Sequence, residues 1–230
     1  MTSAPRRFLV PALSTLIMLV VLLGLGTWQV QRLYWKTAVL AEIATAEAEP
    51  AVPLTQNPAP YTKISVTGRL SFDRAAQFGA EVRDTSAGPT MGFYQIVPLD
   101  RDGPPTILVN RGWAPQKRKT PLDDPAGEVS VTGYVRPAES PSWFSAADNV
   151  AERLFYTLDP KAIAAAVGVT DPAPFILVAL GPSRAEFFPA PAQHLPRPPN
   201  NHLSYVITWY GLAVALAIIF AIWTRKALQP

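Results

Sequence analysis

Two long apolar runs without charged residues lie near the two ends of the chain. Residues 8–27 read FLVPALSTLIMLVVLLGLGT, and residues 205–223 read YVITWYGLAVALAIIFAIW. A helix rises about 1.5 Å per residue, so each run spans roughly 30 Å, the thickness of the hydrocarbon core of a bilayer. The pattern predicts two membrane-spanning helices that flank one domain.

The first run also has one feature of a cleaved signal peptide, because Arg6 and Arg7 form a basic segment before it. It is long for the apolar part of a signal peptide, however, and no A-x-A cleavage pattern follows it. The next residues, WQVQRLYWKTAVLAEIATAEAE, continue the helical pattern to about Glu49. An uncleaved membrane anchor is therefore the favoured interpretation.

Between the two runs, the pattern changes to short segments that are typical of β-strands. Prolines in EPAVPLTQNPAP (49–60) end the helical pattern. In KISVTGRL (63–70), Ile64 and Val66 alternate with polar residues, which places them on the inward face of a strand. Four further segments are rich in β-branched and aromatic residues and are bounded by glycine or proline: 92–99, 106–113, 128–136 and 175–180.

One short helix is expected among these strands. The segment DPKAIAAAVGV (159–169) has Asp159 in the N-cap position and Pro160 at the first helical position. Turns rather than helical crossovers join most of the strands, which favours antiparallel pairing. The predicted fold class is therefore an α+β membrane protein, with two transmembrane helices flanking an antiparallel β-rich extracytoplasmic domain.

Segment boundaries follow from the same pattern. Within the middle domain, residues 189–199 contain five prolines and are expected to form a stiff, extended connector. This connector leads to Asn200 and Asn201, which can cap the second membrane helix, so that His202 falls in its first turn. The predicted segments are the N-terminus 1–7, a transmembrane helix 8–28, the β-rich domain 29–204, a transmembrane helix 205–223 and the tail 224–230.

The basic residues next to the apolar runs predict the orientation of the chain. Arg6 and Arg7 precede the first run and two basic residues follow the second at 225–226, whereas Arg32 and Lys36 lie on the opposite flank. The count favours cytoplasmic termini and a periplasmic middle domain. Because seven residues are too few for a mitochondrial transit peptide, we expect a multi-pass protein of the bacterial inner (plasma) membrane.

The composition excludes several kinds of chemistry. The 230 residues include no cysteine, two histidines and three methionines, which rules out thiolate catalysis and leaves few ligands for a metal centre. No hydrolase triad or phosphate-binding loop is present, so an enzyme is not expected. The basic run PQKRKTP (115–121) is either a solvated loop or a docking surface, and the outward location argues against nucleic acid as its partner.

His202 is the residue near the second membrane helix that is best suited to bind a metal or a cofactor. On a helix, it shares a face with Tyr205 and Trp209. Neutral imidazole is an axial ligand for haem iron and a good ligand for copper. The alternative is an ordinary surface histidine that precedes a membrane helix. The other histidine, His194, lies in the proline-rich segment and is expected to be too exposed to be a buried ligand unless that segment folds back.

A second group of side chains lies near the outer end of the first membrane helix. Trp28, Gln31 and Trp35 share a helical face, and Arg32 follows Trp28 by one turn. Arg32 could pair with a haem propionate if the two helices come together. The alternative is that these aromatic and basic residues only form the belt found at membrane interfaces, and for the aromatic residues that interpretation is favoured.

Several longer motifs follow one another along the chain. They are GTWQVQRLYWK (26–36), MGFYQIVPL (91–99), LVNRGWAP (108–115), VTGYVRPAE (131–139) and NNHLSYVITWYGLA (200–213). In order and spacing they resemble the successive motifs of the Surfeit locus protein 1 family, and FYTLDPKAIAAAVG (155–168) is similar to a further segment of that family. The resemblance covers the chain from end to end.

The resemblance implies a role in the assembly of another protein complex rather than in catalysis. Members of the family act in the biogenesis of haem-copper cytochrome c oxidase, at the stage where haem a enters subunit I, and bacterial members bind haem a. The family position tied to that binding is the histidine that opens the second membrane helix, which is His202 here, and the associated tryptophan is Trp209. Other recurrent family residues are also present: Gly26, Trp28, Arg32, Asn110, Arg111, Gly112 and Trp113.

The resulting hypothesis is a haem a chaperone for oxidase subunit I. His202 would ligate the iron, Trp209 and Trp28 would flank the macrocycle, and Arg32 would neutralise a propionate. Haem a synthase and the lipid bilayer are the other expected partners. A haem-independent scaffold, which would act through the strand 108–115 and the 115–121 loop, is the alternative, and a haem-modifying enzyme is the weakest hypothesis.

Overall fold

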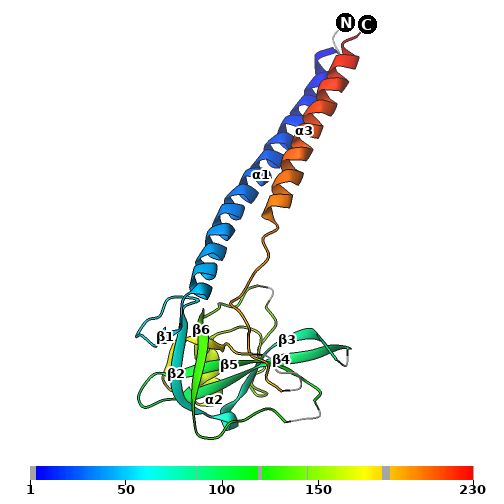
Figure 1. Ribbon diagram of the computed structural model, residues 1–230. Coiled ribbons are helices and arrows are strands. Elements are labelled where there is room, and N and C mark those ends of the chain that lie inside the picture. Colours follow the sequence, from blue (N-terminus) through cyan, green and yellow to red (C-terminus); the bar gives the residue numbers. More distant parts are fainter. Residues whose placement is uncertain (1–3, 87, 119–120, 144, 183–186, 230) are drawn as a thin grey trace. The chain divides into compact units, whose positions relative to one another are not determined.

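The computed structural model describes residues 4–86, 88–118, 121–143, 145–182 and 187–229, and the side chains from residue 8 onward within them. The chain forms two compact units (Figure 1). One comprises Met1–Glu42 and Arg197–Pro230, and the other comprises Ile43–Pro196. Each unit has its own packing.

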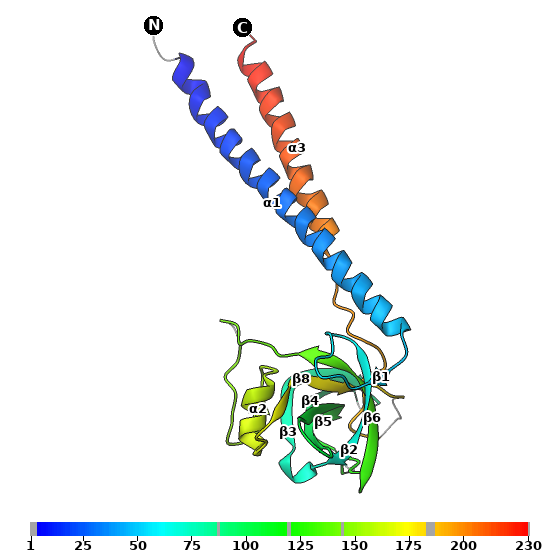
Figure 2. The same ribbon diagram turned by 90° about the vertical axis from the view of Figure 1, so that its left-hand side faces the viewer.

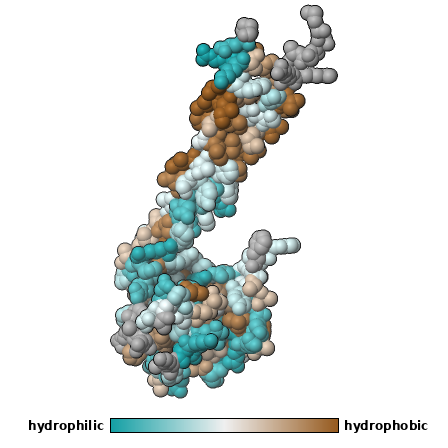
Figure 3. Space-filling model, turned by 90° about the vertical axis from the view of Figure 1, so that its right-hand side faces the viewer, coloured by the Kyte–Doolittle hydropathy of each residue, from teal (hydrophilic) through white to brown (hydrophobic). Residues whose placement is uncertain are grey.

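The first unit consists of two long helices, α1 (Ala4–Ala48) and α3 (His202–Ala227), of which α1 continues beyond the unit boundary. They run antiparallel and side by side (Figures 1 and 2), and the rings of Phe8 and Trp223 meet with their centroids 5.6 Å apart. Both are long and apolar enough to cross a membrane, by length and composition. Figure 3 shows hydrophobic side chains gathered along this helix pair. The predicted continuation of the first helix to about Glu49 is confirmed.

The two helices contact each other along a stripe of small and apolar residues. On α1, Leu22, Gly26 and Gln29 are buried at spacings of four and three residues, and on α3 Ala213 is buried. Such spacing keeps side chains on one helical face. Because α1 has no side chain at Gly26, the ring of Tyr210 packs against its backbone, and a Cβ there would lie 2.7 Å from the ring.

The second unit is a sheet that curls into a barrel, with one short α-helix and one 3₁₀ turn. Neighbouring strands of the barrel pair in antiparallel orientation, except for β5 and β8, which pair in parallel. The elements are β1 (Val52–Pro53), β2 (Lys63–Leu70), η1 (Phe72–Arg74), β3 (Ala76–Thr85), β4 (Gly88–Asp100), β5 (Thr106–Pro115), β6 (Glu128–Pro137), β7 (Leu154–Phe155), α2 (Pro160–Val167) and β8 (Pro172–Ala179).

The barrel closes because β2 pairs with two strands, β6 along most of its length and β4 at its end. The ring therefore runs β2–β4–β5–β8–β6 and back to β2, while β3 and β7 extend the sheet beyond β4. A bent first strand, here β2 and β3 separated by η1, and a parallel pair between the third and fifth barrel strands describe a five-stranded Greek-key barrel of the OB type. Such a barrel is compatible with many activities and by itself assigns none.

Apolar residues fill both the barrel and the space under α2. Alternate residues of β5 belong to two different apolar clusters. Ile107 and Val109 lie inside the barrel, whereas Leu108 packs with the α2 residues Ile163 and Val167. Figure 2 shows α2 against the side of the barrel. A strand that is covered on both faces has a continuous apolar sequence rather than an alternating one, which accounts for TILV in β5 and FILV in β8.

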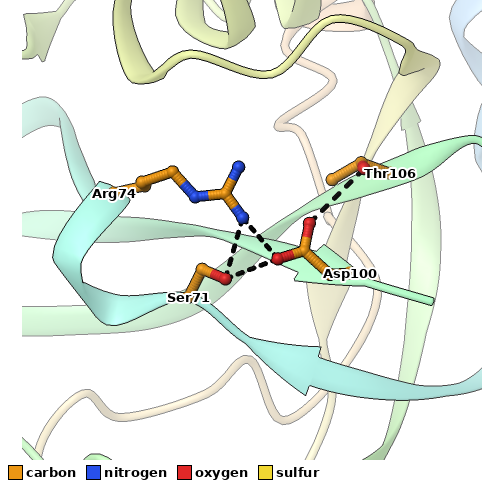
Figure 4. Close-up of polar contacts among 4 residues, drawn as sticks. All are labelled: Ser71, Arg74, Asp100 and Thr106. Carbon is orange, nitrogen blue, oxygen red and sulfur yellow. Dashed lines mark hydrogen bonds and ion pairs between the residues drawn. The ribbon is translucent and has the colours of Figure 1, made fainter.

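A polar cluster ties the bend between β2 and β3 to the end of β4 (Figure 4). Arg74 and Ser71 both donate to the Oδ2 atom of Asp100, and Arg74 also donates to Ser71 Oγ at 2.9 Å. Thr106 Oγ1 is 3.5 Å from Asp100 Oδ1. The cluster therefore joins the 3₁₀ turn to two neighbouring strands at the point where the barrel closes.

The strands expected from the sequence at 63–70, 92–99, 106–113, 128–136 and 175–180 correspond to β2, β4, β5, β6 and β8. The short helix is confirmed as well: Asp159 accepts a hydrogen bond from the Lys161 amide, and Pro160 is the first helical residue. Strand β3 was not predicted, because it pairs near the edge of the sheet and carries charged residues, among them Glu81 and Arg83. The parallel β5–β8 pair was also not anticipated.

The first part of the proline-rich segment is not a free connector. Ala190 exchanges backbone hydrogen bonds with Trp113 of β5, and Ala192 does so with Ala179 and Gly181 at the end of β8. Leu195 is also buried. These residues supply the partner for strand edges that would otherwise be unpaired, so residues up to Pro196 belong to the β unit.

Candidate functional site: the polar end of the helix pair

Helix α3 begins at His202, as predicted, and this places the imidazole in the first helical turn. Asn201 occupies the N-cap position but makes no side-chain capping bond, so that part of the prediction is wrong. His202 is half-buried. Its Nδ1 atom lies 2.7 Å from Oε1 of Gln29 on α1.

Gln29 is the residue of this site that sequence reasoning missed. It is 8% exposed and lies on the same face of α1 as Gly26 and Leu22. A polar side chain that follows the small and apolar residues Leu22 and Gly26 on one helical face is a signal that could have found it. Its amide oxygen, and not a group of the neighbouring Trp28, contacts the His202 imidazole.

Trp28 lies one position before Gln29 and so points about 100° away around the helix. It is exposed, and so are Trp35 and Arg32. The guanidinium carbon of Arg32 lies 5.8 Å from the ring centroid of Trp28 and 5.3 Å from that of Trp35. The three residues thus form a separate cation–π stack on the outer surface of α1.

Further along the helix interface, Tyr210 supplies a second polar contact. Its hydroxyl lies 3.1 Å from Thr27 Oγ1, and its ring fills the space above Gly26. Gly26 was identified in the sequence only as a recurrent residue. The structure gives it a physical role, because a side chain there would displace the tyrosine ring.

Trp209 lies two turns after His202 on α3. Its Nε1 atom is buried and makes no hydrogen bond within the described part of the chain. The Oδ1 atom of Asn200 is in the same situation, although its amide nitrogen donates to Thr37 Oγ1 at 3.3 Å. Buried polar atoms are rarely left without partners, so an unsatisfied N–H donor and carbonyl acceptor mark positions where a bound molecule could supply them.

The residues of the helix pair have the chemistry that a haem requires. Nε2 of His202 makes no hydrogen bond to any residue among those described, while Nδ1 is held by Gln29. The unpaired Trp209 N–H can donate to a polar substituent, and the exposed Arg32 can pair with a carboxylate. The imidazole of His202 is therefore of the type that ligates haem iron, whereas Arg32 lies in the separate stack on the outer surface of α1. His194 is exposed and its Nδ1 lies 2.8 Å from the Leu195 carbonyl oxygen.

The β unit contains a second group of recurrent residues at a bulge in β5. Gln95 of β4 pairs with Gly112, and its neighbour Ile96 pairs with Asn110, so Arg111 is the extra residue. The Asn110 side chain accepts a hydrogen bond from the Gly112 amide at 3.0 Å and holds the bulge. Bulges redirect side chains at the edges of binding sites, and here the redirected side chain is Arg111.

Arg111 is a largely buried cation with several acceptors. Its Nη1 donates to Gln95 Oε1 at 3.1 Å and to the Asp123 carbonyl oxygen at 2.5 Å, and the carboxylates of Asp123 and Asp124 lie 3.8 and 3.6 Å from the guanidinium. Burial lowers the pKa of Arg111, and the two carboxylates offset this only in part. A cavity of about 260 Å³ adjoins it, lined also by Thr132, Leu180 and Pro191.

Trp113 is a core residue whose indole N–H is hydrogen-bonded. It is 2% exposed, and its Nε1 donates to the Glu81 carbonyl oxygen at 3.1 Å. The guanidinium of Arg83 lies 5.4 Å from its ring centroid, and the ring of Phe188 meets it edge-on. In the basic run 115–121, Arg118 lies over Phe93, and residues 119–120 are outside the described residues.

Fold and sites together define a protein with a five-stranded β-barrel unit and a pair of antiparallel, membrane-length helices, the second of which begins at a histidine. The sequence matches the SURF1 family over residues 16–214, and the chain belongs to this family. Together with its relatives, the two apolar helices indicate a membrane protein.

Named relatives are similar over most of their length. A SURF1-like protein of Rickettsia felis is 28% identical over 224 residues, which cover 94% of this chain and 98% of the relative. Surfeit locus protein 1 of Rattus norvegicus is 32% identical over 223 residues, covering 88% of this chain and 71% of the relative. The human protein of that name is 31% identical over 229 residues, covering 90% and 74%.

Proposed function

We propose that this protein is an assembly factor for haem-copper cytochrome c oxidase and that it assists the insertion of haem a into subunit I. Membership of the SURF1 family supports the assembly role. The observation that supports the haem step is the half-buried His202, whose Nδ1 is engaged by Gln29 while Nε2 is left to a ligand. The role is that of a chaperone and not of an enzyme.

The proposed location is the bacterial inner membrane, crossed by α1 and α3, with the β unit in the periplasm. The antiparallel helices bring the Phe8 and Trp223 ends together, so both chain ends lie on one side. Arg225 and Lys226 in the last turn of α3 favour the cytoplasm for that side. His202 then belongs to the opposite, periplasmic end of the helix pair.

Each residue of the site has a separate proposed role. When bound, haem a supplies an iron that accepts an imidazole nitrogen and propionates that accept a cation. His202 would hold the iron through Nε2, and Trp209 would donate its otherwise unpaired N–H. Arg32, stacked between Trp28 and Trp35, would neutralise a carboxylate at the membrane surface, and Trp28 would add an aromatic face. A single histidine ligand keeps the binding exchangeable, as transfer to subunit I requires.

The test is the absorption spectrum of the detergent-purified protein, produced with and without the enzymes of haem a synthesis. We expect a haem a band that requires those enzymes and is lost in His202→Ala. The His194→Ala variant is the matched control, because it removes the other histidine from an exposed position, and it should retain the band. Stoichiometric haem in a correctly inserted His202→Ala variant would rule out this ligand.

A haem-independent scaffold that stabilises an oxidase assembly intermediate is the second candidate. The supporting observation is the cavity beside Arg111, where a buried cation adjoins apolar side chains and could receive a segment of a partner. Cross-linking from residues that line the cavity, such as Thr132 and Leu180, to subunit I or haem a synthase tests it. A colourless protein that restores oxidase activity in a deletion strain would favour this function over haem delivery.

A further inference from the structure

We propose that Gln29 is a positioning residue, which holds the proton of the His202 imidazole on Nδ1 and thereby presents the lone pair on Nε2. The contact that carries this inference is the 2.7 Å approach between Nδ1 and the Gln29 Oε1 atom. The inference deepens the proposed function and rests on it for the identity of the ligand. What it says about the imidazole can be measured in the ligand-free protein.

The proton position follows from the chemistry of the two groups. An amide oxygen only accepts hydrogen bonds, so the ring nitrogen facing it must carry the hydrogen. In a neutral imidazole the other nitrogen, Nε2, then holds the lone pair. The same bond prevents Nδ1 from acting as the ligand atom, so His202 offers one donor atom instead of two.

The burial of Gln29 favours the imidazole over water as the hydrogen-bond partner of its amide oxygen. At 8% exposure between two helices, the amide has little access to water that could replace the imidazole. A buried polar group that loses its partner pays the cost of its desolvation. The ring orientation that satisfies Gln29 is therefore favoured over the alternatives, whereas an exposed histidine would exchange its proton freely between both nitrogens.

Outer partners of this kind are a general feature of histidine ligands. A ligating histidine usually donates its other ring N–H to a carboxylate, carbonyl or water, which fixes the tautomer and the ring orientation. Here the partner comes from the other helix, 173 residues away in the sequence. The site is thus complete only when α1 and α3 are paired, and neither helix alone orients the imidazole.

The competing explanation is that the pair only holds the helices together, since polar side chains are used for that purpose in membrane proteins. The contact between Thr27 and Tyr210 is of this type. Both explanations predict some loss of helix stability when Gln29 is replaced. Because the same hydrogen bond fixes the tautomer in both cases, both explanations also predict that Nδ1 no longer holds the proton of His202. Only the positioning role predicts that this change weakens the binding of haem a.

The experiment is ¹⁵N NMR of ligand-free protein labelled at histidine, in detergent. Since the chain has two histidines, a His194→Asn background leaves the signals of His202 alone. We expect a protonated Nδ1 and an unprotonated Nε2. Gln29→Met, which keeps the length of the side chain but removes the acceptor, should lose this pattern, and Gln29→Glu should keep a protonated Nδ1.

Gln31→Met is the matched control, because Gln31 is an exposed glutamine two residues along the same helix. It should leave the His202 signals unchanged. Titration of haem a into the same variants is the second measurement. Loss of such an outer partner typically weakens metal affinity about 10- to 100-fold, so we expect this loss for Gln29→Met and near-wild-type binding for Gln29→Glu and Gln31→Met.

Two results would overturn the inference: a wild-type His202 protonated on Nε2, or a Gln29→Met variant whose tautomer changes while its affinity for haem a does not. Failure of the proposed function gives a different result. If His202 shows the expected tautomer, but neither the wild type nor any variant binds haem a, Gln29 is supported as the residue that orients the imidazole and the proposed cofactor is wrong.

Discussion

At the scale of single residues, the protein uses hydrogen-bonded polar groups where its elements meet. Glu81 of β3 accepts hydrogen bonds from the Tyr94 hydroxyl and from Arg83. Burial alone would raise the pKa of Glu81, but these two hydrogen bonds and the positive charge of Arg83 together outweigh it, so the pKa lies below its usual value. Burial and the bond to Glu81 raise the pKa of Tyr94. The cluster is therefore ionised at Glu81 and neutral at Tyr94 near neutral pH.

The lowered pKa of Glu81 predicts a pH-dependent contribution to stability. A carboxyl group with a lower pKa in the folded state stabilises the fold above its unfolded pKa and loses that contribution as the pH falls through the folded value. We expect wild type to be more stable than Glu81→Gln at neutral pH, and the difference to shrink in acid below the usual carboxyl range. Denaturant unfolding across this pH range measures the difference. Glu152→Gln, on an exposed carboxylate, is the control and should show no such trend.

At the scale of elements, the bulge in β5 depends on Gly112. Its φ of +122° lies in the region that favours glycine, and a Cβ there would lie 1.9 Å from the Ala190 carbonyl oxygen. The proline-rich segment can therefore pair with β5 only because this position has no side chain. The same bulge sets the direction of Arg111.

Gly112→Ala should destabilise the β unit severely, because it combines a strained backbone with a clash against the paired segment. We expect a loss of at least about 2 kcal/mol, since backbone strain of this kind alone costs about 1–3 kcal/mol. Gly79→Ala is the matched control: Gly79 has a φ of +68° but open space around its Cβ position, so only a strain of about 1–2 kcal/mol is expected. Thermal or denaturant unfolding of both variants provides the comparison, and equal losses would contradict the role of the clash.

At the scale of the whole molecule, the two units have different bases for their stability. The β unit has a barrel interior and a second apolar cluster under α2, and both consist of residues between Ile64 and Leu177. The helix pair is held by contacts between small and apolar side chains and by a few hydrogen bonds. Domains with their own apolar core can fold alone, whereas apolar helices of this length need a membrane or detergent.

Residues 43–196 expressed alone should therefore fold as a soluble β domain. The segment contains every strand of the barrel and both apolar clusters. We expect a cooperative thermal transition and a β-rich circular dichroism spectrum. Non-cooperative unfolding would show that the barrel needs the helix pair. A shorter segment that ends before Pro189 is the informative comparison, because it lacks the residues that pair with Trp113 and Ala179.

Local sequence patterns were sufficient to predict most helices and strands of this fold. The two apolar runs predicted α1 and α3, and alternation or β-branched segments predicted five strands. Asp159 and Pro160 marked the start of α2. Strand β3 was not predicted because its charged side chains have partners on the neighbouring strand β4. The Glu81 carboxylate, for example, accepts a hydrogen bond from Tyr94 of β4, and no local sequence pattern shows such a contact.

The sequence by itself determined the class of the protein and its two apolar helices, and it singled out His202 as a candidate ligand, because length, hydrophobicity and residue type are local properties. Only the tertiary structure decided what surrounds that histidine. Gln29 and His202 are 173 residues apart, and no local pattern shows that Gln29, rather than its neighbour Trp28, contacts the imidazole. Barrel closure and the docking of the proline-rich segment depend likewise on hydrogen bonds between distant strands, which no short stretch of sequence specifies.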